Sequence, residues 1–160
     1  MITCLTRKAA AAASPAALIA LLIAGAAGCG DTPSDPEAAV RAWVAQGVER
    51  AEAKDRRALV DMISAAYTDA RGNKRDDIEN MFRIYFLRQH TVALLTRIEA
   101  LAVHDESAAE LTLAVGMAGT NDGVLGFSAD AYRFEMELER DGDDWLLISA
   151  RWGEFGEELR

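Results

Sequence analysis

Four stretches in the second half of the chain alternate apolar with polar or small side chains, which is the period of a strand with one buried face. They span residues 92–104, 109–118, 131–140 and 145–152. The third stretch is the most regular, because an apolar side chain alternates with Arg or Glu at Tyr132, Phe134, Met136 and Leu138. Short segments rich in Asp, Gly and Ser separate several of the stretches and are typical of turns. The pattern predicts a meander of four antiparallel strands.

Three segments ahead of the strands carry apolar residues at the spacing of one helical face. The first begins near Asp35, with Pro36 at the first helical position, and ends at a break formed by Lys54 and Asp55. A short second helix follows this break, and a third is predicted over residues 74–90. We therefore expect an α+β domain in which three N-terminal helices pack on a curved four-stranded antiparallel sheet.

The first 28 residues have the build of a bacterial secretion signal. Arg7 and Lys8 precede the apolar run 16–27, which is shorter than the roughly 20 residues of a membrane span. The segment Ala26-Ala27-Gly28 before Cys29 resembles the lipobox of bacterial lipoproteins, although that family usually has Leu at the position of the first Ala. An ordinary secretory signal, with Cys29 left as a free thiol, is the alternative.

The resemblance to lipoproteins implies a defined processing. A diacylglycerol is attached to the sulfur of Cys29, residues 1–28 are removed, and the new N-terminus is acylated in many bacteria. Two or three acyl chains make a lasting anchor. Gly30, rather than Asp, after the cysteine implies the periplasmic face of the outer membrane in a Gram-negative cell. Residues 29–35 then form a lipidated tether, and residues 36–160 form a single domain.

Charge and cysteine content narrow the range of partners. The chain has 17 basic and 26 acidic residues, and removing Arg7 and Lys8 leaves 15 basic residues and a formal net charge of −11. This charge argues against nucleic acid and against docking by charge on anionic lipid. The second cysteine, Cys4, lies in the signal, so the mature domain has neither a disulfide nor a thiol nucleophile. No complete metal or phosphate motif is present, and we expect no metal and no cofactor.

The order of the predicted elements resembles that of the nuclear transport factor 2-like superfamily, a cone-shaped α+β fold. The segment 67–72, Tyr-Thr-Asp-Ala-Arg-Gly, and the aromatic last strand, 145–152, support this resemblance, which covers about residues 36–152. The chain is similar in particular to envelope lipoproteins of unassigned activity. The superfamily contains isomerases, dehydratases and cyclases with an Asp or His base inside the cone, as well as non-catalytic subunits, so the fold does not decide the function.

Two residues are candidates for a catalytic base. Asp69 lies in the loop that borders the mouth of the cone in this fold, although Asp is also a common turn former. His90 ends the third predicted helix, where a cap is the structural alternative. No carboxylate occurs among the inward-pointing positions of the third and fourth strands.

Aromatic residues suggest a ligand pocket, and a single loop suggests a contact surface. The candidate pocket residues are Trp43, Tyr67, Tyr85, Arg97, Tyr132 and Trp145. The alternative to a pocket is that the aromatic residues fill the core. The alternative for Arg97 is that it forms a cross-strand ion pair. The loop 119–128 groups Leu125 and Phe127 beside glycines, and we expect it to face a partner or the bilayer.

These patterns predict a lipid-anchored periplasmic binding or scaffold module of the cell envelope that is not an enzyme. Its partner would be an envelope protein or a small apolar molecule, and a homodimer is compatible with the sequence. The alternative is a small-molecule isomerase, dehydratase or cyclase that uses Asp69 or His90 as its base.

Overall fold

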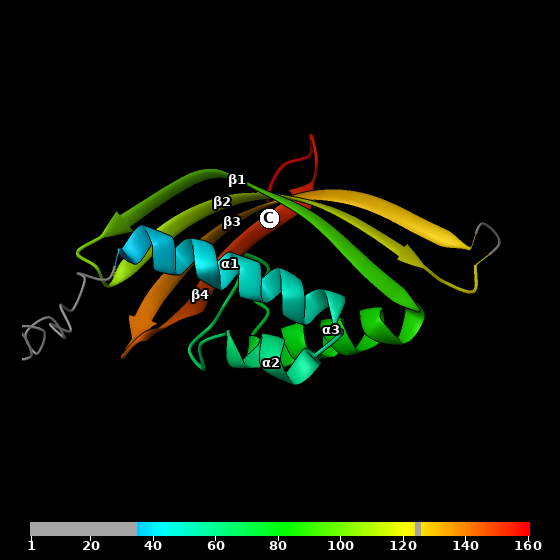
Figure 1. Ribbon diagram of the computed structural model, residues 1–160, viewed down its shortest axis with the longest axis horizontal. Coiled ribbons are helices and arrows are strands. Elements are labelled where there is room, and N and C mark those ends of the chain that lie inside the picture. The colour runs from blue at the N-terminus through cyan, green and yellow to red at the C-terminus, as the bar shows by residue number, and fades with distance from the viewer. Residues whose placement is uncertain (1–34, 124–125) are drawn as a thin grey trace, which may run out of the picture. The chain divides into compact units, whose positions relative to one another are not determined.

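The computed structural model describes residues 35–123 and 126–160, and the predicted signal, Cys29 and Leu125 lie outside this part of the chain. Residues Ser34–Arg160 form one compact unit. Its elements, in chain order, are α1 (Pro36–Glu52), α2 (Arg56–Asp61), α3 (Arg75–Arg88), β1 (Thr91–His104), β2 (Ala108–Thr120), β3 (Phe127–Asp141) and β4 (Asp144–Glu154). The strands form one antiparallel sheet in the order β1-β2-β3-β4 (Figure 1). The predicted fold class is confirmed.

The helix starts follow from their capping residues. The Asp35 carboxylate accepts hydrogen bonds from the backbone N–H groups of Glu37 and Ala38 at 3.0 and 3.3 Å, which starts α1 where the sequence predicts. The Asp55 carboxylate accepts from the N–H of Ala58 at 3.0 Å and starts α2 in the same way. Lys54, with a φ of 55°, makes the break between these two helices.

The third strand begins earlier than predicted. It starts at Phe127 rather than Ala131, so both ends of the predicted loop 119–128 belong to strands, Gly119 and Thr120 to β2 and Phe127 and Ser128 to β3. Pairing with β2 extends the strand, because Thr120 is opposite Phe127 and Gly119 is opposite Ser128. After Phe127, residues 128–131 of β3 are Ser, Ala, Asp and Ala, so this part of the strand carries no large apolar side chains at the period by which a strand is recognised.

The sheet has one covered and one open face. The three helices lie under its concave face, where α1 packs on β1 and β4 (Figure 1). Two hydrophobic clusters fill parts of this layer, one around Ile63, Leu111 and Met136 and one around Val40 and Leu138. The convex face carries charged, small and exposed apolar side chains, which gives each strand its alternating character.

The outer edge of β4 is covered by the segment between α2 and α3. The N–H of Leu147 donates to the carbonyl of Met62 at 3.0 Å, and the N–H of Ser64 donates to the carbonyl of Leu147 at 2.9 Å. Further along, Thr68 and Ala70 donate to carbonyls of the same strand. This pairing removes an exposed sheet edge and fixes the end of α2 against the sheet.

Helix α3 packs on α2 and has few contacts with the sheet (Figure 1). The Arg75 guanidinium donates to the carbonyl of Val60 at 3.0 and 3.1 Å, and Arg56 forms an ion pair with Glu79 at 2.5 Å. The Lys54 ammonium donates to the carbonyl of Gln89 at 3.0 Å and closes the C-terminal end of α3. In the described residues, no helix is both long enough and apolar enough to cross a membrane.

Candidate functional site: an apolar cavity under the sheet

A cavity of about 620 Å³ lies between the helices and the concave face of the sheet. Apolar and aromatic side chains form most of its wall, and they come from the buried stripe of each helix and the inward rows of the strands. The principal lining residues are Trp43, Val44 and Val48 from α1, Ile78, Phe82 and Tyr85 from α3, and Thr96, Leu113, Val115, Tyr132, Phe134 and Trp152 from the sheet. A wall of this kind is typical of a small-molecule site.

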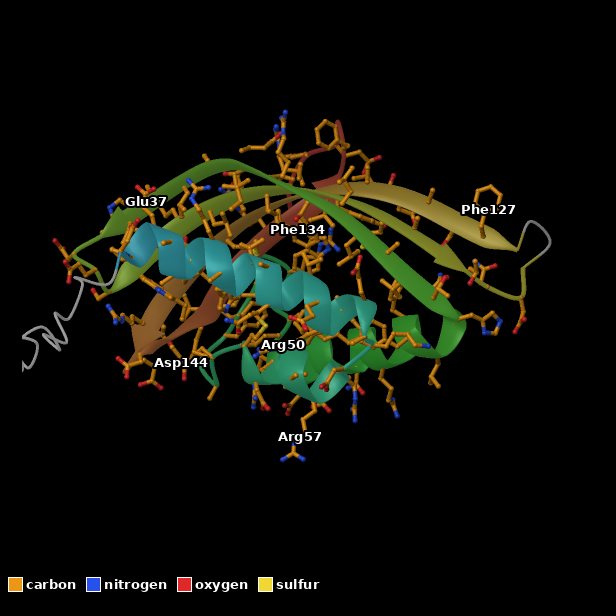
Figure 2. All side chains as sticks on the ribbon, viewed as in Figure 1. Glu37, Arg50, Arg57, Phe127, Phe134 and Asp144 are labelled. Carbon is orange, nitrogen blue, oxygen red and sulfur yellow. The ribbon has the colours of Figure 1, made fainter. Side chains whose placement is uncertain are left out.

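Aromatic rings form the far wall of the cavity. Phe134 and Trp152 stack with their ring centres 6.3 Å apart, and Phe134 points from β3 toward the helices (Figure 2). The Arg71 guanidinium lies 4.6 Å from the Trp152 ring and donates to the carbonyl of the same residue at 3.2 Å, which fixes the position of that ring. The candidate set from the sequence omitted Phe134 and Trp152. The alternation of β3 places Phe134 on the inward face, whereas Trp152 reaches that face because the register of β3 and β4 shifts between Glu137 and Leu138.

The three tyrosines of the chain, Tyr67, Tyr85 and Tyr132, all line the cavity. Burial raises the pKa of the Tyr67 phenol well above its usual value of 10.0, and the charge of Asp69 raises this pKa further. Burial and the nearby Asp130 carboxylate raise the pKa of Tyr85 and of Tyr132. All three phenols are therefore neutral at physiological pH and offer O–H donors to a ligand.

The two candidate bases lie outside the cavity wall. Asp69 is buried in its loop, where its carboxylate accepts from the N–H of Arg71 and of Asn73, both at 2.8 Å, and from the Asn73 amide at 2.7 Å. These three bonds are those of a turn-forming Asp. His90 is exposed, and its Nε2 lies 2.8 Å from the Asp122 carboxylate. Neither side chain is positioned to move a proton inside the cavity.

Two of the six predicted pocket residues lie elsewhere. Arg97 is exposed on the convex face, where it donates to the Glu99 carboxylate at 3.0 Å. Hydrogen bonds from Arg97 and Arg133 lower the pKa of Glu99, so this cluster is a surface ion-pair network. Trp145 is buried in the second hydrophobic cluster, against Val40 and away from the cavity.

Trp43 lies at the boundary between the cavity and the two hydrophobic clusters. Its indole Nε1 is buried and has no hydrogen-bond partner in the described residues.

The structure describes only one of the two apolar residues of the predicted contact loop. Phe127 belongs to β3 and is 61% exposed, at an end of the sheet beyond the residues of β3 that pair with β4 (Figure 2). Leu125 lies outside the described residues. In the described chain no group of acidic, His or Cys residues is arranged to hold a metal ion.

The family models and the curated proteins contain no match to this sequence. Solved structures do match. A candidate scytalone dehydratase from Novosphingobium aromaticivorans aligns with a TM-score of 0.65 at 7% identity, over 77% of this chain and 89% of that protein. A candidate dehydratase of the nuclear transport factor 2-like family from Streptomyces avermitilis aligns with a TM-score of 0.65 at 11% identity, over 78% and 100%. The chain has the nuclear transport factor 2-like fold.

A ketosteroid isomerase-like protein from Erwinia carotovora atroseptica aligns with a TM-score of 0.62 at 12% identity, over 78% of this chain and 99% of that protein. These identities are too low to carry an activity from any of the three proteins to this chain. The nuclear transport factor 2-like fold therefore explains the cone and its cavity, and the function depends on the residues that line it.

The shared location of the tyrosines gives a pH prediction. We expect the phenolate absorbance of the folded domain to change little near pH 10, the ordinary pKa, and to rise only at higher pH. In urea the same three tyrosines should titrate near pH 10. Because the folded state holds the proton more tightly, the contribution of the tyrosines to the free energy of unfolding should be constant below pH 10 and fall above it. Identical titration curves with and without urea would contradict the burial of these phenols.

Proposed function

We propose that this chain is a lipid-anchored envelope protein whose domain binds one neutral, apolar small molecule in the cavity and does not transform it. The observation that supports the proposal most directly is the composition of the wall. No Asp, Glu or His occurs among the residues that line the cavity. These side chains are the most frequent general bases, and a general base must lie within hydrogen-bond reach of the proton that it abstracts. Tyr67, with its raised pKa, is a hydrogen-bond donor and a poor proton acceptor.

The size of the cavity supports binding over a purely structural role. A cavity of about 620 Å³ that opens to solvent is within the range of small-molecule sites, roughly 300–1,000 Å³. Water is a poor filling for an apolar space, because it needs two to four polar partners there. An apolar ligand would regain the lost contacts. The open apolar cavity therefore favours a ligand-binding module over a scaffold with a filled core.

The lining also limits the chemistry of the ligand. The cavity has a single cationic side chain, Arg88, which is exposed, and Asp130 places a negative charge near Tyr85 and Tyr132. A carboxylate ligand would therefore lack a buried counterion. A neutral molecule with apolar rings or chains and one or two oxygen acceptors suits the aromatic wall and the phenol donors.

Filling the cavity tests the binding function. Val115 lies between Thr96 and Tyr132 in the sheet register and faces the cavity. We expect Val115→Trp to occupy this space and to weaken binding of the neutral fluorescent probe N-phenyl-1-naphthylamine by about tenfold or more. Fluorescence titration of the purified domain measures the dissociation constant.

The matched control introduces the same side chain on the other face of the same strand. Ala118 is exposed on the convex face, beside Ala93 and Ala129. Ala118→Trp should leave probe binding within about twofold of the wild type. If wild-type protein does not bind the probe, or if both tryptophan variants bind it equally well, the cavity is not the ligand site.

The anchor is proposed from the sequence pattern at Cys29. Cys29→Ser should abolish acylation, and most of the protein should then leave the membrane fraction of cells that express the full chain. Intact mass measurement of the wild-type protein should give an N-terminus at Cys29 with acyl chains attached. An unacylated wild-type protein that begins at another residue would show that this proposal is wrong.

A further inference from the structure

The opening of the cavity is formed by one stripe of α3. Among the residues that line the cavity, only Met81, Ile84 and Arg88 are exposed to solvent. Met81 is 42% exposed and Ile84 is 45% exposed, which is unusual for large apolar side chains in the wall of a cavity. We call these three residues the rim. They follow one another at helical spacing, so a ligand that enters through this opening passes along one surface of α3.

The rim continues into an apolar surface with basic residues beside it. Leu87, one turn along from Ile84, is 80% exposed and does not line the cavity. Arg83 and Arg88 lie, like Leu87, in the C-terminal half of α3. Arg57 projects from the neighbouring α2 on the side away from the sheet (Figure 2). Exposed apolar groups beside arginines are the composition of a surface that binds anionic lipid.

Charge is divided between the layers of the domain. Residues 54–90, which contain α2 and α3, have eight Lys and Arg against six Asp and Glu. Residues 91–160, which contain the sheet, have five Lys and Arg against fifteen Asp and Glu. The net charge of the whole chain therefore does not describe its parts: the sheet is strongly acidic, residues 54–90 are weakly basic, and residues 35–53, which contain α1, have two Lys and Arg against four Asp and Glu. An anionic surface would attract the segment of α2 and α3 and repel the sheet.

We propose that α3 docks on an anionic phospholipid bilayer, with Leu87 and the rim against the lipid, so that the ligand passes between membrane and cavity without crossing water. The docking surface stands on its own, whereas the transfer of a ligand rests on the proposed binding function. The contact is small and need only be weak, because an anchored domain meets the membrane at high effective concentration.

Vesicle flotation of the unacylated chain that begins at Gly30 tests the docking, because any binding must then come from the surface of the domain. The probe is a vesicle of phosphatidylcholine with about one third phosphatidylglycerol, compared with phosphatidylcholine alone. We expect flotation with the anionic vesicles to exceed flotation with the neutral ones by at least about fivefold. It should be lost when the salt is raised from about 0.1 M to about 1 M.

The chain offers a matched pair of variants. Leu87 on α3 and Leu95 on the convex face of β1 are both 80% exposed. Leu87→Ser should reduce flotation with anionic vesicles by at least about threefold, and Leu95→Ser should leave it unchanged. Neither leucine lines the cavity, so both variants should bind N-phenyl-1-naphthylamine like the wild type.

Each result has a distinct meaning. Probe binding without flotation, an equal loss in both leucine variants, or a dimer that Leu87→Ser dissociates would overturn the docking proposal and leave the binding function intact. Flotation that depends on Leu87 in a protein that never binds the probe would support docking and overturn the binding function.

Discussion

The hydrogen bonds between the segment after α2 and the outer edge of β4 set the spacing on which the rest of the domain depends. Met62, Ser64, Thr68 and Ala70 pair with β4 in turn, so the end of α2 lies at the edge of the sheet instead of under its centre. Helix α3 is held to α2 by Arg75 and is closed at its C-terminal end by Lys54. The concave face between α1 and α3 is therefore left partly open, and the cavity is a consequence of backbone pairing at one edge.

The curvature of the sheet complements this spacing. Irregularities in register between Ile98 and Ala100, and between Glu137 and Leu138, bend the strands near the end that α1 covers. At that end Trp145 and Leu138 fill the space under the sheet against Val40. Toward the other end the tyrosines and Phe134 line the open cavity between the helices and the sheet. One sheet thus provides a packed half for stability and an open half for binding.

The sequence predicted the elements well because periodicity and capping are local properties. Asp35, Pro36 and the Lys54 break determine the limits of α1, and the alternation from Tyr132 to Leu138 determines the face of β3. Arg97 was a pocket candidate with an ion pair as the alternative, and it lies in an ion-pair network on the convex face. The irregularity after Ile98 shifts the alternation of β1 by one residue, so Arg97 and the inward Leu101 lie on opposite faces although they are four residues apart.

The open cavity could not be predicted, because no local pattern encodes the distance between α3 and the sheet. Trp145 and Trp152 belong to the same aromatic strand, yet one is buried in a filled cluster and the other lines the cavity. The rim was missed for a related reason. The exposure of Met81 and Ile84 appears only when the helix is placed beside an unfilled space.

The separation of charge is also a property of the fold rather than of the composition. A net charge of −11 for the mature chain suggests a uniformly acidic particle, whereas the acidic residues are concentrated in the strands and their turns. Helices α2 and α3 carry a small excess of arginine and lysine. The domain therefore has a side that tolerates an anionic surface and a side that avoids it, and the cavity opens on the former.

The central claim is that the cavity holds one neutral molecule, and native mass spectrometry of the protein extracted from the envelope tests it most directly. The account predicts a complex heavier than the acylated chain by the mass of a single uncharged small molecule, released as a neutral species when the collision energy is raised. A spectrum that contains only the acylated chain under the gentlest conditions, and no added mass after incubation with N-phenyl-1-naphthylamine, would contradict the account.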